Sequence, residues 1–159
     1  MGFGSGIVVP GTGISLQNRA VGVNLKEGHP NQVGGGKRPF HTIIPAFLMK
    51  DGQPEMSFGM MAGPMQAQGH VQLMLRMFAY GQNPQAAADG PRWQVLEGRN
   101  VAIEEDFPAD VLIQLEARGH QLHRKPRQPF FGGAQLIYRM KDGYCGASEP
   151  RKEGQAVGF

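Results

Sequence analysis

The stretch FGMMAGPMQAQGHVQ, residues 58–72, joins a predicted strand to a predicted helix through a turn of small residues. Residues 43–49 and 55–58 are predicted to be the two strands of a hairpin, because the turn-forming residues Lys50-Asp51-Gly52 separate them. Beyond the small-residue turn, apolar side chains recur at helical spacing, at Val71, Leu73, Met74, Met77 and Phe78. The turn therefore places the N-terminus of a helix at the end of a sheet.

A helix N-terminus of this kind offers backbone N–H groups that have no intrahelical partner, together with the positive end of the helix dipole. Such a terminus can hold a carboxylate, a phosphate or a developing oxyanion. The alternative is an ordinary strand-to-helix connection in which Met60, Met61 and Met65 simply pack in the interior. From the local sequence alone, the ordinary connection is the more frequent outcome.

Composition and charge exclude several classes of protein. With 159 residues, of which 40% are hydrophobic, the chain can form one domain with a core, and its 24 glycines predict many tight turns. The formal charge of +3 is mild. The basic run between Arg118 and Arg127 is typical of a solvated edge, and because no nucleic-acid-binding motif accompanies it, we expect no nucleic-acid partner.

The sequence predicts no metal and no other cofactor. His120 and His123 are three residues apart, but no cysteine or carboxylate completes a ligand set, so a structural pair is favoured. Cys145 is the single cysteine, which excludes an intrachain disulfide and leaves the compartment undetermined. The glycines near the start lack the order of a dinucleotide-binding loop. No run of about 18 apolar residues predicts a membrane segment.

The order of predicted elements indicates an α+β fold with layers. Short strands are predicted at 7–9 and 14–16, and because such strands need partners, we expect further sequence upstream of Met1. Residues 24–37 are predicted to be a flexible loop, and residues 148–159 a polar C-terminal tail. Between them we expect a helix opened by Asn83-Pro84, strands at 92–96 and 100–103, a helix from Asp106-Phe107-Pro108 to Gly119, a strand at 120–123, and a hairpin of 134–140 with 144–147.

Several motifs, in this order, together resemble one known family. They are Phe3-Gly4-Ser5-Gly6-Ile7-Val8, Gly13-Ile14-Ser15-Leu16-Gln17-Asn18, Lys37-Arg38-Pro39, Ala88-Asp89-Gly90-Pro91-Arg92 and Gly146-Ala147-Ser148-Glu149-Pro150-Arg151. With the strand, turn and helix at 55–78, they make residues 1–159 similar to the small, C-terminal subunit of the gamma-glutamyltransferases. The resemblance implies a layered αββα N-terminal-nucleophile hydrolase fold, incomplete at its N-terminus here. It also implies a partner, the N-terminal or large-subunit portion of the same precursor.

The resemblance implies acyl-transfer chemistry on a small-molecule acyl amide, of the gamma-glutamyl (glutathione) type or a related one. In this family a threonine freed by autocleavage attacks the carbonyl carbon and forms an acyl-enzyme. Thr12 and Thr42 do not match that threonine, so the nucleophile is expected upstream of Met1 and the chain alone is expected to be inactive. The alternative is a non-catalytic binding or scaffold remnant of the same fold.

Four residues match positions with a role in the family. Ala62 and Gly63 fall on two glycines whose backbone amides form the oxyanion hole, and alanine supplies the amide provided that its φ need not be positive. His41 and Thr42 fall on two serines that hold the α-carboxylate of glutathione-type substrates. The resemblance therefore implies that Ala62 and Gly63 serve catalysis, and that His41 and Thr42, with Arg19, bind substrate.

Two departures from the family pattern concern the substrate's α-ammonium group. Arg19 stands where glutathione-type members have a glutamine, and Gly22 stands where they have the aspartate that binds this group. A cation at position 19 and no carboxylate at position 22 would repel an ammonium. The sequence therefore predicts a divergent acylase or amidohydrolase that prefers acyl amides without the α-amine.

Overall fold

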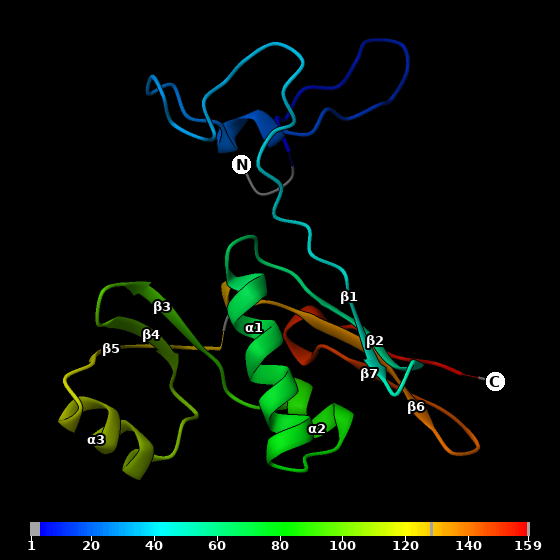
Figure 1. Ribbon diagram of the computed structural model, residues 1–159, viewed down its shortest axis with the longest axis vertical. Helices are drawn as coiled ribbons and strands as arrows, with labels where there is room; N and C mark the ends of the chain where they lie inside the picture. Colours follow the sequence, from blue (N-terminus) through cyan, green and yellow to red (C-terminus); the bar gives the residue numbers. More distant parts are fainter. Residues whose placement is uncertain (1–3, 128, 159) are drawn as a thin grey trace. The chain divides into compact units, whose positions relative to one another are not determined.

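The computed structural model describes residues 4–127 and 129–158. The chain divides into two units, Met1–Thr42 and Ile43–Phe159, which are considered separately below. Within the second unit lie all the α-helices and β-strands of the described residues (Figure 1). In chain order they are β1 (Ala46–Lys50), β2 (Gln53–Met60), α1 (Met65–Met74), α2 (Pro84–Asp89), β3 (Trp93–Glu97), β4 (Asn100–Glu104), α3 (Ala109–Ala117), β5 (Gln121–Lys125), β6 (Ala134–Met140) and β7 (Gly143–Ser148).

The first unit consists mostly of turns and loops, with one 3₁₀ turn at Arg19–Gly22. The strands predicted at 7–9 and 14–16 are wrong, because only a single bridge between Val8 and Ser15 joins the two segments. Their apolar side chains stay in solvent, Ile7 at 58% and Ile14 at 59% exposure, so no buried face favours a longer ladder. Residues 24–37 form no helix or strand, and their flexibility stays a prediction.

A four-stranded antiparallel sheet in the order β1-β2-β6-β7 organises the second unit. Both predicted hairpins are confirmed, β1–β2 around Asp51-Gly52 and β6–β7 around Asp142. The first strand begins at Ala46 instead of the predicted residue 43. Pro45 has no N–H to donate, and the N–H of Ile44 donates to the side-chain oxygen of Gln66 at 3.1 Å instead of to a neighbouring strand.

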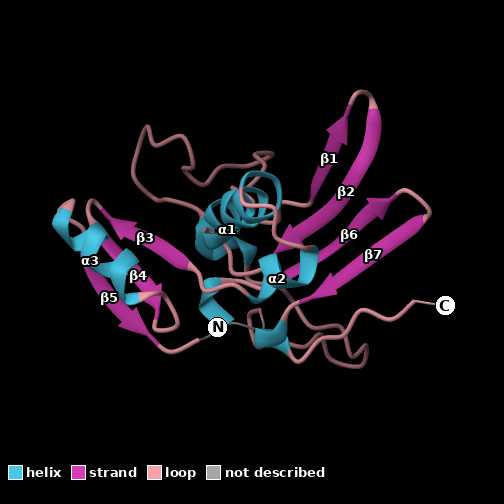
Figure 2. Cartoon of the chain, turned by 90° about the horizontal axis from the view of Figure 1, so that it is seen from below, coloured by secondary structure: helices cyan, strands magenta, loops and turns pink. Residues whose placement is uncertain are grey.

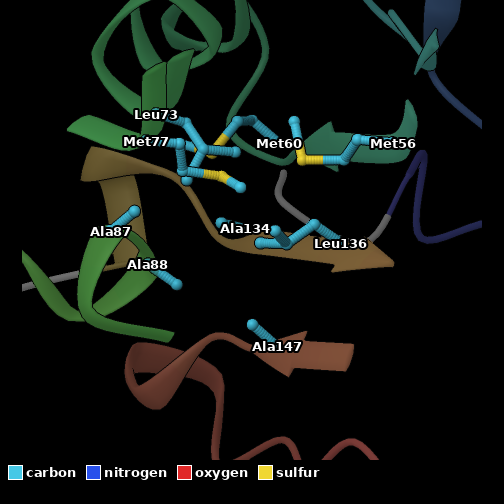
Figure 3. Packing of buried hydrophobic residues seen from close by; sticks show 9 residues of the cluster. All are labelled: Met56, Met60, Leu73, Met77, Ala87, Ala88, Ala134, Leu136 and Ala147. Atoms are coloured by element: carbon cyan, nitrogen blue, oxygen red, sulfur yellow. The ribbon is translucent and has the colours of Figure 1, made fainter. Parts of the chain in front are cut away.

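Helices α1 and α2 cover one face of this sheet and enclose the main core (Figures 1 and 2). A π-helical turn, Leu75–Ala79, extends α1. Figure 3 shows how side chains from α1 and from the strands point toward one another in the core. The buried cluster comprises Met56, Met60, Leu73, Met77, Ala87, Ala88, Ala134, Leu136 and Ala147. Methionine fills irregular gaps well, so this core tolerates the mixture of large and small residues.

A second, three-stranded sheet has the order β3-β4-β5, with β4 and β5 parallel and joined through α3 (Figure 2). Side-chain amides of α1 form hydrogen bonds with backbone N–H and carbonyl groups on the free edge of β3. Gln68 both accepts from the N–H of Val95 (2.8 Å) and donates to its carbonyl (3.2 Å), and Gln72 does the same for Trp93 (3.0 and 2.9 Å). These four bonds replace a missing neighbouring strand and attach the small sheet to the helix that follows the turn.

The end of the chain differs from the predicted polar tail. Ser148 and Glu149 are buried, and the side chain of Arg151 is only 1% exposed. Glu149 and Arg151 are charged, but each is paired with another buried charged group, which is the condition under which charge is tolerated inside a protein. The predicted α+β fold is confirmed. Within the described residues no helix is both long enough and apolar enough to span a bilayer.

Candidate functional site

The turn between β2 and α1, residues Met61–Pro64, is the centre of the candidate site (Figure 1). The carbonyls of Ala62 and Gly63 accept hydrogen bonds from the N–H groups of Met65 (3.1 Å) and Gln66 (3.0 Å), which begins the helix. The N–H groups of Ala62 and Gly63 donate to no other residue in the part of the chain that the structure describes. Both residues are half-exposed, so two adjacent amide donors at a helix N-terminus are accessible to a ligand.

The backbone of this turn is strained. Gly63 has φ +53°, and Ala62 has φ +83°, which corrects the expectation that alanine would be accommodated here without a positive φ. Among the described residues, only Asp51 and Glu153 share a positive φ without being glycine. For a residue with a Cβ, the left-handed region costs about 1–2 kcal/mol. Strain of this kind collects at functional sites, where it holds groups in an otherwise unfavourable geometry.

The turn is fixed against the segment that precedes β6. The N–H of Met61 donates to the carbonyl of Gly133 at 3.0 Å. Gly132 has φ +94°, and a Cβ on it would lie 3.0 Å from Cε of Met60 and 3.2 Å from the carbonyl oxygen of Met61. Because these contacts leave no room for a side chain, glycine at 132 allows the two segments to approach closely.

Glu149 in turn fixes the segment that holds Met61. Its Oε2 accepts hydrogen bonds from the N–H of Ala134 and from Nη2 of Arg92, both at 2.7 Å. The same Arg92 guanidinium donates to the carbonyl of Phe131 at 3.4 Å. The segment 131–134 is thus held at both ends by one buried ion pair. A continuous chain of bonds leads from Glu149 to the turn.

Arg151 extends this ion pair into a buried network of four charged side chains, Glu104, Arg92, Glu149 and Arg151. Arg151 binds Glu104 through two bonds, at 2.7 and 2.6 Å, and binds Glu149 at 2.6 Å. Further N–H and carbonyl groups complete the hydrogen bonding, among them the N–H of Arg92, which donates to Glu104 at 2.8 Å. Bidentate arginine–carboxylate pairs are the strongest of their kind.

Burial and charge pairing shift the pKa values of Glu149 and Arg151 in opposite directions. Burial by itself raises the pKa of Glu149, but the charge of Arg92, the N–H of Ala134 and the bond from Arg151 outweigh it and place the pKa below its usual value. Burial likewise lowers the pKa of Arg151, and its bonds to Glu104 and Glu149 reverse that effect. The shifted pKa values of Glu149 and Arg151 both favour the charged form, so each of these two groups depends on the charges paired with it.

Sequence reasoning did not find this network. Glu149 and Arg151 belong to a motif that carries the family resemblance, but their local sequence predicts only a polar tail. Arg92 likewise closed another such motif, Ala88–Arg92. The sequence does offer one signal for a buried ion pair: Arg92 and Glu149 each lie in a motif with small residues, although the two motifs are far apart in the chain.

Two of the predicted substrate-binding residues meet in the first unit. Nη1 of Arg19 donates to the hydroxyl of Thr42 at 2.8 Å, and both residues are half-exposed. His41 is exposed. A Cβ on Gly22 would meet only the carbonyl oxygen of Phe40, at 3.9 Å, so nothing crowds a side chain at that position. The pairing of Arg19 with a hydroxyl forms a cationic, hydrogen-bonding site that suits a carboxylate.

The histidine pair does not form a site in the described residues. Nε2 of His123 lies 3.0 Å from the side-chain oxygen of Asn100, whereas Nδ1 of His120 is buried and has no hydrogen-bond partner there. No group of three or more histidine, cysteine, aspartate or glutamate side chains in those residues could hold a metal ion.

Comparison with known proteins places these features in a family. The sequence matches the family described as gamma-glutamyltranspeptidase over residues 1–159. It is 34% identical to a glutathione hydrolase-like YwrD proenzyme of Bacillus subtilis and 33% identical to an oxamate amidohydrolase proenzyme of Klebsiella pneumoniae, in each case over 99% of this chain. The chain spans about a third of the length of these curated relatives, 31% of each.

Solved structures agree with the sequence matches. The chain superposes on a cephalosporin acylase from Bacillus halodurans with a TM-score of 0.93 and 46% sequence identity, over 98% of this chain and 30% of the acylase. The fold is shared also with a gamma-glutamyltranspeptidase from Pseudomonas nitroreducens, with a TM-score of 0.83 and 23% identity, over 99% of this chain and 87% of that one. The chain therefore belongs to the gamma-glutamyltranspeptidase family.

Proposed function

We propose that the whole protein is an amidohydrolase or acyltransferase that cleaves acyl amides through an acyl-enzyme, and that the amides of Ala62 and Gly63 form its oxyanion hole. One observation carries this proposal: two adjacent N–H groups at the start of α1 have no partner among the described residues. Donors held ready for a developing negative charge stabilise a tetrahedral intermediate without reorganising during the reaction.

The attacking hydroxyl lies upstream of residue 1 in this proposal, at the residue freed by autocleavage. Its oxygen bonds to the amide carbon while its proton passes to the free α-amino group of the same residue, and the carbonyl oxygen becomes an oxyanion between the two N–H groups. The C–N bond then breaks as the amine nitrogen takes that proton. Water, or an acceptor amine, then attacks the ester and releases the acyl group. The chain of 159 residues by itself is consequently inactive.

We propose further that the acyl group has a carboxylate and no α-amine. Arg19 and Thr42, joined at 2.8 Å, fit a carboxylate, and Gly22 offers no acceptor for an ammonium. An unpaired buried ammonium costs several kcal/mol, so discrimination against glutathione of tenfold or more is expected. The similarity to an oxamate amidohydrolase and to a cephalosporin acylase supports a divergent substrate.

The decisive experiment uses the full-length protein with glutathione and with a matched glutaryl amide. A kcat/KM at least tenfold higher for the glutaryl amide is expected. In a second arm, Gly22→Asp restores a carboxylate at a position that has space for one, and the preference should move toward glutathione. Preference of the unchanged protein for glutathione by tenfold or more contradicts the specificity. Absence of turnover with every amide, together with an upstream residue other than Thr, Ser or Cys at the cleavage point, favours a non-catalytic scaffold.

A further inference from the structure

Three polar side chains from α1 and from the π-helical turn that extends it bind backbone atoms of one extended segment, residues 91–95, which leads into β3. They follow one another at a spacing of four residues, and their partners at a spacing of two. The pairs are Gln68 with Val95, Gln72 with Trp93, and Arg76 with Pro91. This set of bonds is here called the helix–strand contact.

The spacings of the helix–strand contact match because four residues of helix rise about 6 Å and two residues of strand about 6.7 Å. Successive side chains on one face of the helix therefore meet successive backbone groups on one edge of β3. The other edge of the same segment is bound to β4, where the carbonyl of Arg92 accepts from the N–H of Glu104 at 3.0 Å. The helix thus occupies the position of a further strand of the small sheet.

Gln72, at the middle of the contact, is only 5% exposed and has every polar atom bonded. Its Nε2 donates to the carbonyls of Trp93 (2.9 Å) and Gln68 (3.1 Å), and its Oε1 accepts from the N–H of Trp93 (3.0 Å). A sliding or rotation of α1 along β3 would break several of these bonds together and leave buried polar groups without partners, which is costly. The contact therefore fixes α1 along its axis and about it.

The helix–strand contact begins close to the candidate oxyanion hole. Gln68 follows Gly63 by five residues, which is about 7.5 Å along a helix. The bond from the N–H of Met61 to the carbonyl of Gly133, at 3.0 Å, fixes the strand side of the turn. The helix–strand contact fixes the helix side, so the position of the Ala62 and Gly63 amides follows the position of α1.

We propose that Gln68 and Gln72 are positioning residues, which hold the amides of Ala62 and Gly63 at the place where the oxyanion forms by binding α1 to β3. This inference rests on the proposed function, because only a reaction at those amides makes their exact position important. A displacement of about 1 Å at a reacting centre can cost about 10²-fold in rate. Both glutamines act through the backbone of α1, so their loss should lower kcat and leave KM nearly unchanged.

The test compares Gln68→Met and Gln72→Met with the unchanged full-length protein, on the amide that the unchanged protein cleaves fastest. Methionine has the length of glutamine but no N–H donor and only a weak acceptor. We expect kcat, calculated per autocleaved molecule, to fall about 10–100-fold, with KM changed by less than about twofold. Rates are measured well below the melting temperature of each variant.

Gln85→Met is the matched control. Gln85, in the first turn of α2, makes the same pair of bonds to the edge of a strand, because it binds the N–H and the carbonyl of Ser148 at 3.1 and 2.9 Å. Its bonds within the described residues do not involve α1. The melting temperature should decrease about as in Gln68→Met, while kcat stays within about twofold of the unchanged value. An equal loss of kcat in Gln85→Met would assign the effect to general destabilisation and overturn the proposal.

Gln68→Glu adds a pH-dependent readout. Gln68 uses one acceptor and one donor toward Val95; a protonated carboxyl group supplies both, whereas a carboxylate cannot donate. The kcat of Gln68→Glu, divided by that of the unchanged protein at the same pH, should recover as the pH falls from 8 toward the usual glutamate pKa of about 4.3. Gln68→Met should show no recovery, and a ratio for Gln68→Glu that ignores pH would overturn the proposal.

The remaining outcomes separate this proposal from the proposed function. An unchanged kcat in both methionine variants, or a loss confined to KM, overturns the positioning role while the proposed function stands. Absence of turnover by the unchanged protein with every amide contradicts the proposed function, and the positioning role with it.

Discussion

The buried network around Glu149 and the turn at Ala62–Gly63 differ in how fully their polar groups are hydrogen-bonded. In the network, carboxylates and guanidinium groups meet at 2.6–2.7 Å and the side chains are at most 3% exposed. In the turn, two N–H groups have no partner among the described residues, and an alanine adopts φ +83°. The network pairs its polar groups and is expected to stabilise the fold. The turn leaves two N–H donors unpaired among the described residues, which costs folding free energy but keeps the donors ready for the proposed binding and catalysis.

The largest effect on the free energy of unfolding is expected for Glu149→Gln. This change removes the charge that pairs with Arg92 and Arg151 and leaves two buried guanidinium groups insufficiently compensated. Breaking a buried ion pair from one side typically costs about 3–5 kcal/mol. Urea unfolding of the full-length protein measures it, with Glu116→Gln on the exposed surface of α3 as the control. A loss below 1 kcal/mol would show that the network contributes little to stability.

A smaller effect, dependent on pH, is expected at His70, which lies on α1. Its Nε2 is buried without a partner among the described residues, its ring lies 5.0 Å from that of Phe58, and burial lowers its pKa from the usual 6.5. Below pH 6.5 the unfolded chain takes up a proton that the folded chain resists, so the contribution of His70 to stability decreases as the pH falls below 6.5.

Urea midpoints at several pH values between 5 and 8 test this expectation. His70→Leu should flatten the decrease toward low pH, because the group that titrates is removed. His29→Leu, at an exposed position of the first unit, should leave the decrease unchanged. An unaltered pH profile in His70→Leu would mean that the decrease comes from other groups.

The smallest effect is expected for Ala62→Gly. Glycine relieves the cost of φ +83°, about 1–2 kcal/mol, but it also increases the entropy of the unfolded chain by roughly 0.4–1 kcal/mol. A net gain of about 0–1.6 kcal/mol in the free energy of unfolding follows, with the amide donor retained. A less stable Ala62→Gly variant would show that the methyl group contributes packing that outweighs the strain.

Local patterns in the sequence predicted much of the second unit. Asn83 does accept the N–H of Ala86 at 2.8 Å and begins α2, as its position before Pro84 indicated. The two hairpins followed from Asp-Gly turns between apolar runs. These features depend on neighbours within a few residues, which a single sequence displays directly.

The features that the sequence did not predict depend on residues far apart in the chain. The pairing of Arg92 with Glu149 joins positions 57 residues apart, and nothing local distinguishes it from a polar tail. Ala62 adopts φ +83° next to the place where Gly132 and Gly133 approach Met60 and Met61, and no local pattern encodes that approach. Of the site, the resemblance located the turn and the residues Arg19 and Thr42, and the structure adds their bond at 2.8 Å. Their roles in catalysis and binding stay predictions.

If the amides of Ala62 and Gly63 stabilise an oxyanion, replacing one of the two N–H groups by an ester oxygen should slow the chemical step. Gly63→Pro would also delete a donor, but proline requires φ near −65° and Gly63 has φ +53°, so that variant would distort the turn. Glycolic acid in place of Gly63, in the full-length protein, removes the N–H and keeps the backbone conformation. We expect kcat to fall about 10²–10³-fold, with a much smaller change in KM and an unchanged melting temperature. An unchanged kcat, or a loss confined to KM, would contradict it.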